Sequence, residues 1–236
     1  MRTQRGAALI VALWALALLS LIVGTAVQTT RLENRQSAYE LHHLEAQLAA
    51  EAGFAMALKD LSSSKSVMIA DGRPYPFFFE DTQLTLRVYS ERGKLDLNFC
   101  SIESLTLLAS FFGASPNQTQ QMAQELSKRR ANLSTIKAIE ELQQFPEMDS
   151  RLYVQMEPFL TLWSGLVQPD TSFALAPVRA ALKLEIPVSR GNPGSVLSAK
   201  IYAIHTTGTT ADLNVTFLLN SQGDNAQLYR VLRWQE

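Results

Sequence analysis

The feature that most constrains this chain is an uncharged apolar run near its start. The segment from Ala7 to Thr30 contains no charged side chain, and the basic residues Arg2 and Arg5 precede it. A helix rises about 1.5 Å per residue, so this run is long enough to cross a hydrocarbon layer of roughly 30 Å. We therefore expect one membrane-spanning helix over residues 7–30 that tethers a water-soluble body.

The charges beside this run predict its orientation in a membrane. Arg2 and Arg5 lie before it, whereas Arg31, Glu33 and Arg35 follow it with mixed sign. Positively charged flanks favour the cytoplasmic side. We expect a cytoplasmic N-terminus and a soluble body on the opposite side of the membrane.

Three interpretations of this N-terminal segment stay open from the residues alone. A cleaved secretory signal has an apolar stretch of about 7–15 residues with a small-x-small cleavage site behind it. A signal anchor stays uncut, and its expected length matches this run. A prepilin-type leader is cut before the run, after a glycine beside a basic residue, and Arg5-Gly6-Ala7 is placed for such a cut.

Charge and cysteine content argue against several classes of function. The chain has 21 basic and 22 acidic residues, so its net charge of -1 gives no general attraction for nucleic-acid phosphates. Cys100 is the single cysteine, which excludes an intramolecular disulfide and a cysteine-rich metal site. We expect it to be a buried, unreactive thiol. The glycine and serine motifs of hydrolases and nucleotide-binding enzymes do not occur, so we expect a non-enzymatic protein.

The helical pattern continues beyond the apolar run. No proline occurs between residues 31 and 61, so we expect one helix from Ala7 to about Leu61. Apolar residues recur there at three- and four-residue steps and form one stripe: Leu41, Leu44, Leu48, Ala52, Ala55 and Leu58. We expect this stripe to serve the sheet of the chain itself and the helices of partner proteins, with core packing as the simpler role for any single leucine.

The rest of the chain alternates between strand and helix patterns. Period-two alternation predicts strands at 75–79 and 84–88, after a turn at 71–74. Short one-sided helices are expected within 101–163, including 136–145, and a further helix near 177–182. The C-terminal part of the sequence predicts strands at 200–208, 213–220 and 228–234. A hairpin turn is expected at 221–224, between the last two strands.

These elements predict an α+β fold. A long N-terminal helix would pack on an antiparallel sheet, and an all-helical subdomain, sterile-alpha-motif-like or helix-hairpin-helix-like, would be inserted between strands. The expected segments are residues 1–6, which are a leader in the prepilin interpretation, a transmembrane helix at 7–30, the first part of the sheet domain at 31–98, the helical insertion at 99–163, and the second part of the sheet domain at 164–236.

Few residues are candidates for chemistry. His42 and His43 are adjacent, so on a helix they point about 100° apart and cannot share one metal as an i, i+4 pair can. His205 is expected to be an ordinary strand residue, and Glu140-Glu141 and Lys128-Arg129-Arg130 to be solvated helix surface. Oxygen-rich residues near the last hairpin can bind calcium, although turn formation explains them without a metal: Asp212, Asn214, Asn220, Asp224 and Asn225.

Several segments in a fixed order resemble one protein family. They are Arg5-Gly6 with the apolar run, the stretch from Arg31 to Glu33, the Glu51-Ala52-Gly53 segment, the segment from Gly93 to Asn98, residues 139–148 and 152–162, and the closing segment from Tyr229 to Trp234. Over nearly its whole length the chain is similar to the K-type minor pseudopilins of type II secretion systems (general secretion pathway protein K).

This resemblance implies a pilin-like fold and a processing step. A prepilin peptidase would cut between Gly6 and Ala7 and methylate the new amine, and the protein would start in the bacterial inner membrane with its body in the periplasm. Members cap the tip of the pseudopilus with the I-type and J-type minor pseudopilins. Most pilin-like proteins have a glutamate five residues after the cut, whereas this chain has Val11, as K-type members do. An apolar residue suits a tip subunit, because a carboxylate there would lack a neighbouring amine to pair with. Members of the family can bind calcium, but no ligand set carries over to this chain.

Two other classes remain open. A minor pilin of a type IV pilus or competence system would share the leader and differ in its partners. A membrane-tethered helix-hairpin-helix protein would bind DNA, but the turn at Phe145-Pro146-Glu147-Met148 has a carboxylate where contact with phosphate needs a small neutral residue. We expect no nucleic-acid partner.

Overall fold

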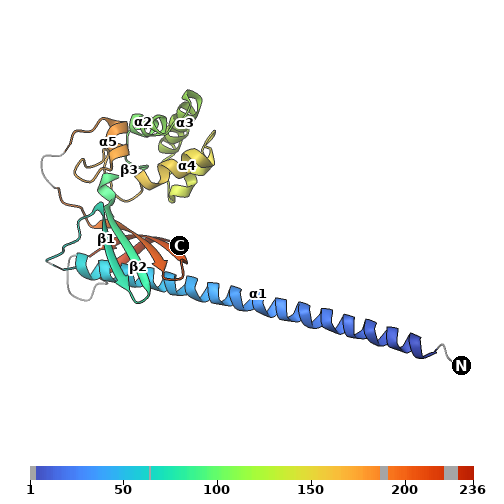
Figure 1. Cartoon of the computed structure of the whole chain (residues 1–236). Helices are drawn as coiled ribbons and strands as arrows, with labels where there is room; N and C mark the ends of the chain where they lie inside the picture. The colour runs from blue at the N-terminus through green and yellow to red at the C-terminus, as the bar shows by residue number, and fades with distance from the viewer. Residues whose placement is uncertain (1–3, 64, 187–190, 221–227) are drawn as a thin grey trace.

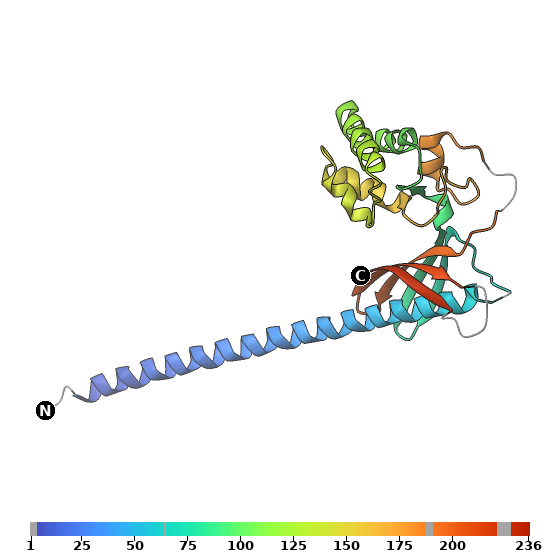
Figure 2. The ribbon, with the colours of Figure 1, turned by 180° about the vertical axis from the view of Figure 1, so that it is seen from behind.

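The computed structural model describes residues 4–63, 65–186, 191–220 and 228–236. The chain forms a long N-terminal helix, a sheet of five strands and a helical unit, arranged as Figure 1 shows. The sheet lies between the C-terminal part of the long helix and the helical unit, and both views show the N-terminus far from either (Figure 2). This arrangement agrees with the predicted α+β fold.

The long helix α1 extends over Gln4–Leu61 without interruption. Its 58 residues correspond to a rod of about 87 Å. Residues 9–41 are exposed on every side, and Ala46 is the first fully buried residue of the helix. Within the described residues, α1 is one helix long and apolar enough to cross a membrane. The predicted continuous helix to Leu61 is therefore confirmed, with its start at Gln4 rather than Ala7.

The sheet is antiparallel throughout and has the order β1-β2-β5-β6-β7. Its strands are β1 (Asp71–Phe79), β2 (Thr82–Ser90), β5 (Val196–His205), β6 (Thr210–Leu219) and β7 (Tyr229–Gln235). The strands predicted before and after the helical segment are confirmed. The two groups of strands join in one sheet where β2 pairs with β5. The predicted hairpin turn at 221–224 lies outside the described residues.

The turn predicted at 71–74 is wrong, because these residues form the start of β1. The register shifts between Asp71 and Pro74, which marks a β-bulge, and Gly72 has a φ of 83°. An edge strand accommodates both the bulge and the proline, because one side of it has no strand to pair with.

The first core lies between α1 and the sheet. The register aligns Leu86 with Ile201 and Ile201 with Leu213, so alternate residues of β2, β5 and β6 face the helix. A Cβ at Gly53 would lie 3.2 Å from Leu84 Cδ1, so the helix backbone closely approaches the sheet. Small residues and one aromatic ring of α1 complete this core: Ala46, Ala49, Ala50, Gly53, Phe54 and Ala57.

The second core belongs to the helical unit. Its elements are η1 (Glu91–Gly93), β3 (Leu95–Asp96), α2 (Ile102–Phe111), α3 (Pro116–Ala131), η2 (Ile139–Gln144), α4 (Ser150–Met156), η3 (Glu157–Phe159), β4 (Leu160–Thr161) and α5 (Ala176–Leu182). β3 and β4 form a short parallel pair within the unit, where β3 precedes α2 and β4 follows η3. Ser101, Ser115 and Asp149 cap the N-termini of α2, α3 and α4 with side-chain oxygens.

The helical unit differs from its prediction in two respects. Its buried core includes Leu95, Leu97, Val178 and Ala181, which lie outside the expected segment 99–163. The α-helix predicted at 136–145 is wrong, because this segment forms only the short 3-10 helix η2.

Extended backbone bounds η2 on both sides, at Ala138 before it and at Phe145 after it, and Pro146 accounts for the conformation of Phe145. Its ψ is 141°, and Pro146 follows. A residue before proline is sterically biased away from the α-helical conformation.

Candidate functional site

The predicted apolar stripe of α1 lies mostly in solvent. Leu41, Leu44 and Leu48 are 50–55% exposed, and Ala55 is also exposed. Ala52 and Leu58 are half-buried, and Leu58 packs against the first core. Core packing is therefore the wrong interpretation for the first three leucines, which form an apolar surface that the sheet does not cover.

Helix geometry explains why these leucines are exposed. Successive residues turn by about 100°, so Leu44 and Ala46 point about 200° apart. The face with small residues lies on the sheet, because a face of leucines would hold the helix further away. The exposed leucines can therefore contact another apolar helix without disturbing the packing of α1 on its own sheet.

The predicted processing residues lie in the first two turns of α1. Arg5, Gly6 and Ala7 have helical backbone, and their side chains lie outside the described residues. Val11 is 67% exposed, on the part of the helix far from the folded body. This end of the helix projects away from the sheet and the helical unit (Figure 1).

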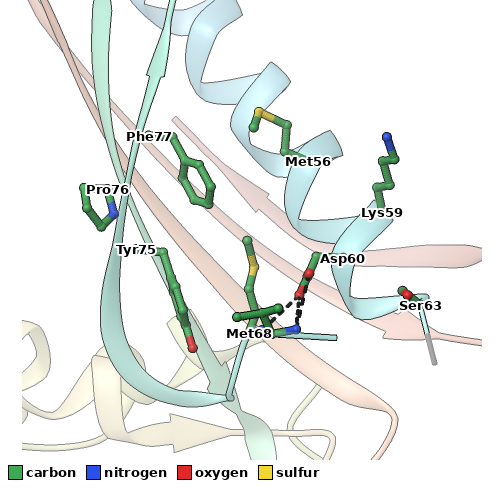
Figure 3. Close-up of a pocket in the computed structure, with 9 residues that line it drawn as sticks. Met56, Lys59, Asp60, Ser63, Met68, Tyr75, Pro76 and Phe77 are labelled. Atoms are coloured by element: carbon green, nitrogen blue, oxygen red, sulfur yellow. Dashed lines mark hydrogen bonds between the residues drawn. The ribbon is translucent and has the colours of Figure 1, made fainter. Parts of the chain in front are cut away.

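A second apolar surface is a cleft of about 530 Å³ between the C-terminal end of α1 and β1. Figure 3 shows Phe77 and Tyr75 of β1 on one side of it and Met56 of α1 on the other. The cleft borders the edge strand and is lined by nine residues: Met56, Lys59, Asp60, Ser63, Val67, Met68, Tyr75, Pro76 and Phe77. It can receive an apolar side chain.

Asp60 organises one wall of this cleft. Its carboxylate accepts hydrogen bonds from the backbone N–H groups of Val67 and Met68 and from the Ser66 hydroxyl. Partial burial raises the pKa of Asp60, but these donors outweigh that effect and hold its pKa below the usual value. The carboxylate thus fixes the segment that follows α1.

Ion pairs of Arg233 and a hydrogen bond from Ser198 connect the helical unit to the sheet. The Arg233 guanidinium of β7 donates to Glu157 Oε1 and Glu140 Oε1, each at 2.5 Å. At the other connection, buried Glu91 accepts from Lys94 Nζ at 2.5 Å and from the hydroxyl of Ser198 in β5. Residues 93–98 and 229–234 are two of the segments that resemble the K-type family. These contacts place both of them where the helical unit meets the sheet.

Lys128 is exposed, as expected for solvated surface, and Glu140 pairs with Arg233 of β7, whereas Arg129, Arg130 and Glu141 are engaged within the helical unit. Arg129 bonds Glu125 and Glu141, and it lies over the Phe145 ring at 5.1 Å. Arg130 donates to the Cys100 carbonyl at 2.5 Å. The solvated-surface interpretation is wrong for these residues, because their partners fix the turns of the unit.

The single cysteine is buried as predicted. Cys100 is 0% exposed, and burial raises the pKa of its thiol to about 11. A thiol with this pKa is almost wholly protonated at neutral pH and is a poor nucleophile.

Three residues that no sequence pattern linked come together beside the sheet. His42 and Glu45 of α1 lie against His205 at the end of β5, and the two imidazole rings stack with centroids 4.8 Å apart. His43 points elsewhere and bonds the Thr210 carbonyl at 3.2 Å. Of the calcium candidates, Asp224 and Asn225 lie outside the described residues.

The protruding apolar helix, packed by its C-terminal part on an antiparallel sheet, defines a pilin-like fold. Residues 5–55 match the PilX N-terminal family. Among solved structures, the chain is similar to one in the crystal structure of the GspK-GspI-GspJ complex from the type 2 secretion system of enterotoxigenic Escherichia coli. That match has a TM-score of 0.59 and 12% sequence identity, and covers 86% of this chain and 98% of the other. No curated protein matches this chain.

Proposed function

We propose that this chain is a K-type minor pseudopilin that caps the pseudopilus of a type II secretion system and supports its assembly. The observation that carries the proposal is the division of α1 into two faces: small residues pack on the sheet, whereas Leu41, Leu44 and Leu48 stay exposed. A subunit that joins a filament needs such a free apolar face for its neighbours. The fold similarity to a chain of the GspK-GspI-GspJ complex supports I-type and J-type minor pseudopilins as those neighbours.

The N-terminal end of α1 has the features that a prepilin peptidase substrate needs. Arg5-Gly6-Ala7 supplies the cleavage sequence at the accessible end of the helix, followed by the apolar segment. The protein would reside in the inner membrane with a cytoplasmic N-terminus and a periplasmic body before assembly. Val11 would suit the tip position, where no neighbour offers an amine to a carboxylate. A Val11→Glu variant should therefore lower secretion.

We propose a structural rather than an enzymatic role. The surfaces described above are apolar and can bind protein side chains. The buried Cys100 thiol has a raised pKa, and the ion pairs of Arg129 and Arg233 hold the fold together. These groups serve stability rather than an exposed reaction site.

Co-purification tests this function directly. The full-length protein is co-expressed with candidate I-type and J-type minor pseudopilins, extracted in detergent and isolated through a tag on one partner. A stable complex is expected, and a Leu41→Ala/Leu44→Ala/Leu48→Ala variant should bind roughly a hundredfold more weakly, because each half-exposed leucine contributes about 1 kcal/mol on burial. Leu133→Ala/Val154→Ala, which changes exposed residues of the helical unit, is the matched control. Equal binding by both variants would contradict the proposal.

A minor pilin of a type IV pilus or competence system is the second candidate. The PilX N-terminal match covers residues 5–55, which contain the leader and long helix that both classes share. The same co-purification separates the two candidates when type IV minor pilins are included as alternative partners.

Binding of DNA by the helical unit is less favoured. Arg129 and Arg130 of α3 are committed to partners inside the protein. Glu147 is exposed at the turn after η2, with a φ of 62°, so a negative charge lies where phosphate would approach. Tight DNA binding at about 150 mM salt would favour this candidate over a pseudopilin.

A further inference from the structure

His42, Glu45 and His205 converge at the point where α1 first reaches the sheet. His42 Nδ1 lies 3.0 Å from Glu45 Oε2, and His205 Nε2 lies 3.5 Å from the same oxygen. One possible ligand atom from each residue lies within 4.8 Å of the others. A single carboxylate oxygen is therefore close to two imidazole nitrogens that come from different elements of the fold.

This set of groups fits a transition-metal ion. Two imidazole nitrogens and one carboxylate oxygen are a ligand set of zinc sites that keep an open position. Zinc bonds of about 2.1 Å in a tetrahedron separate the ligand atoms by about 3.4 Å. The 3.0 and 3.5 Å separations already lie near that value. His42 is half-buried on a helix surface, so a small rotation of its ring can close the remaining separation.

The surroundings of His205 orient its ring for such a site. Its side chain is 8% exposed, and Nδ1 lies 2.8 Å from Thr207 Oγ1, which lies 3.3 Å from Thr209 Oγ1. In the tautomer without a proton on Nδ1, the backbone N–H of Thr207 donates to this nitrogen, at 3.3 Å. With its proton on Nδ1 and donated to Thr207 Oγ1, the ring presents the lone pair of Nε2 toward Glu45. Metal-bound histidines are commonly held by a hydrogen bond at the other nitrogen in this way.

The neighbouring histidine has a different environment and provides a natural comparison. His43 Nδ1 lies 3.2 Å from the Thr210 carbonyl, and its ring stacks on Tyr39. It is not part of the group formed by His42, Glu45 and His205. A non-specific affinity of surface histidines for metal would involve His43 as much as His42.

We propose that His42, Glu45 and His205 form a zinc site that bridges α1 and the end of β5. The fourth position faces solvent beside Glu45, whose side chain is 46% exposed, and would hold water. Because its ligands come from a helix and a strand, the bound ion would fix α1 against the sheet just before the helix leaves the body. This inference does not depend on the proposed function in secretion.

Titration of the untagged full-length protein with zinc tests the site. The protein is purified in detergent, treated with EDTA, dialysed and titrated with ZnCl₂ in a calorimeter. We expect one zinc ion per chain and a rise in the thermal midpoint of the body. Cobalt(II) should give the visible absorption of a four-coordinate site, and Ca²⁺ should not compete, because imidazole is a poor calcium ligand.

Variants then assign the ligands. His42→Ala and Glu45→Gln change partly exposed side chains, so both should fold, and each should bind zinc at least about tenfold more weakly. His43→Ala should bind zinc like the unmodified protein. Stoichiometric binding that survives His42→Ala and Glu45→Gln, or that His43→Ala abolishes equally, would overturn the proposal. Absence of zinc binding by the unmodified protein would also overturn it, and would leave the cluster as a hydrogen-bonded contact alone.

Discussion

Replacing Phe54 with alanine should strongly destabilise the sheet domain. Phe54 is 4% exposed, and its ring makes edge contacts with Phe217, Tyr229 and Trp234 at centroid distances of 5.2, 5.8 and 5.9 Å. Loss of a buried phenylalanine costs about 3–5 kcal/mol, and aromatic pairs place this site in the upper half of that range. We expect Phe54→Ala to lower the free energy of unfolding by about 4 kcal/mol.

Leu48→Ala is the matched comparison, six residues earlier on the same helix. Leu48 is 53% exposed, and leucine and alanine are both strong helix formers. The free energy of unfolding should therefore change by only about 0.5 kcal/mol. The contrast tests which face of α1 holds the sheet.

Urea unfolding of the full-length protein in detergent, followed by tryptophan fluorescence, measures both changes. Trp234 contacts Phe54 directly and therefore reports on the sheet. Equal destabilisation by the two variants, or a loss above about 2 kcal/mol for Leu48→Ala, would refute the assignment of the two faces.

Three further predictions concern the contact between the helical unit and the sheet and the packing of buried residues. Gly93→Ala should cost about 3 kcal/mol in unfolding free energy, measured by urea titration, because its Cβ would lie 2.2 Å from the Phe173 carbonyl oxygen; unchanged stability would contradict that close approach. Partial burial raises the pKa of Glu140, but hydrogen bonds, including that from Arg233, outweigh it and lower its pKa. The Arg233–Glu140 pair therefore stabilises the fold above the unfolded pKa of Glu140, about 4.3, and this stabilisation is lost as the pH falls through the folded pKa. Arg233→Ala should lower the free energy of unfolding by about 1 kcal/mol at pH 7. This loss should shrink at pH 3, which parallel urea titrations at the two pH values measure. The Cys100 thiol, with its pKa raised to about 11 by burial, should react with iodoacetamide at pH 8 about a hundredfold more slowly than in urea, and equal rates would show that it is not buried.

The secondary structure was largely predictable because it depends on local pattern. The absence of proline from residues 31–61 predicted the long helix, and alternation at Leu84, Leu86 and Val88 predicted β2. The helix predicted at 136–145 failed because extended residues bound η2 on both sides, Ala138 before it and Phe145 after it, and only the second follows from a local signal, Pro146.

The exposed leucine face and the histidine cluster were less predictable than the secondary structure, because both depend on tertiary contacts. Periodicity identified Leu41, Leu44 and Leu48 as a stripe but could not show that a face of small residues approaches the sheet in their place. His205 is far from His42 in sequence, and only the pairing of β5 within the sheet brings the two rings together.

The most direct test of the account is the intact mass of the protein isolated from the membrane of the cell that makes it. A prepilin-class subunit should begin at Ala7 with one methyl group on its amine, and Gly6→Val should leave the leader attached. A mature protein that retains residues 1–6, that starts beyond residue 30, or that is processed normally as the Gly6→Val variant would contradict the central claim.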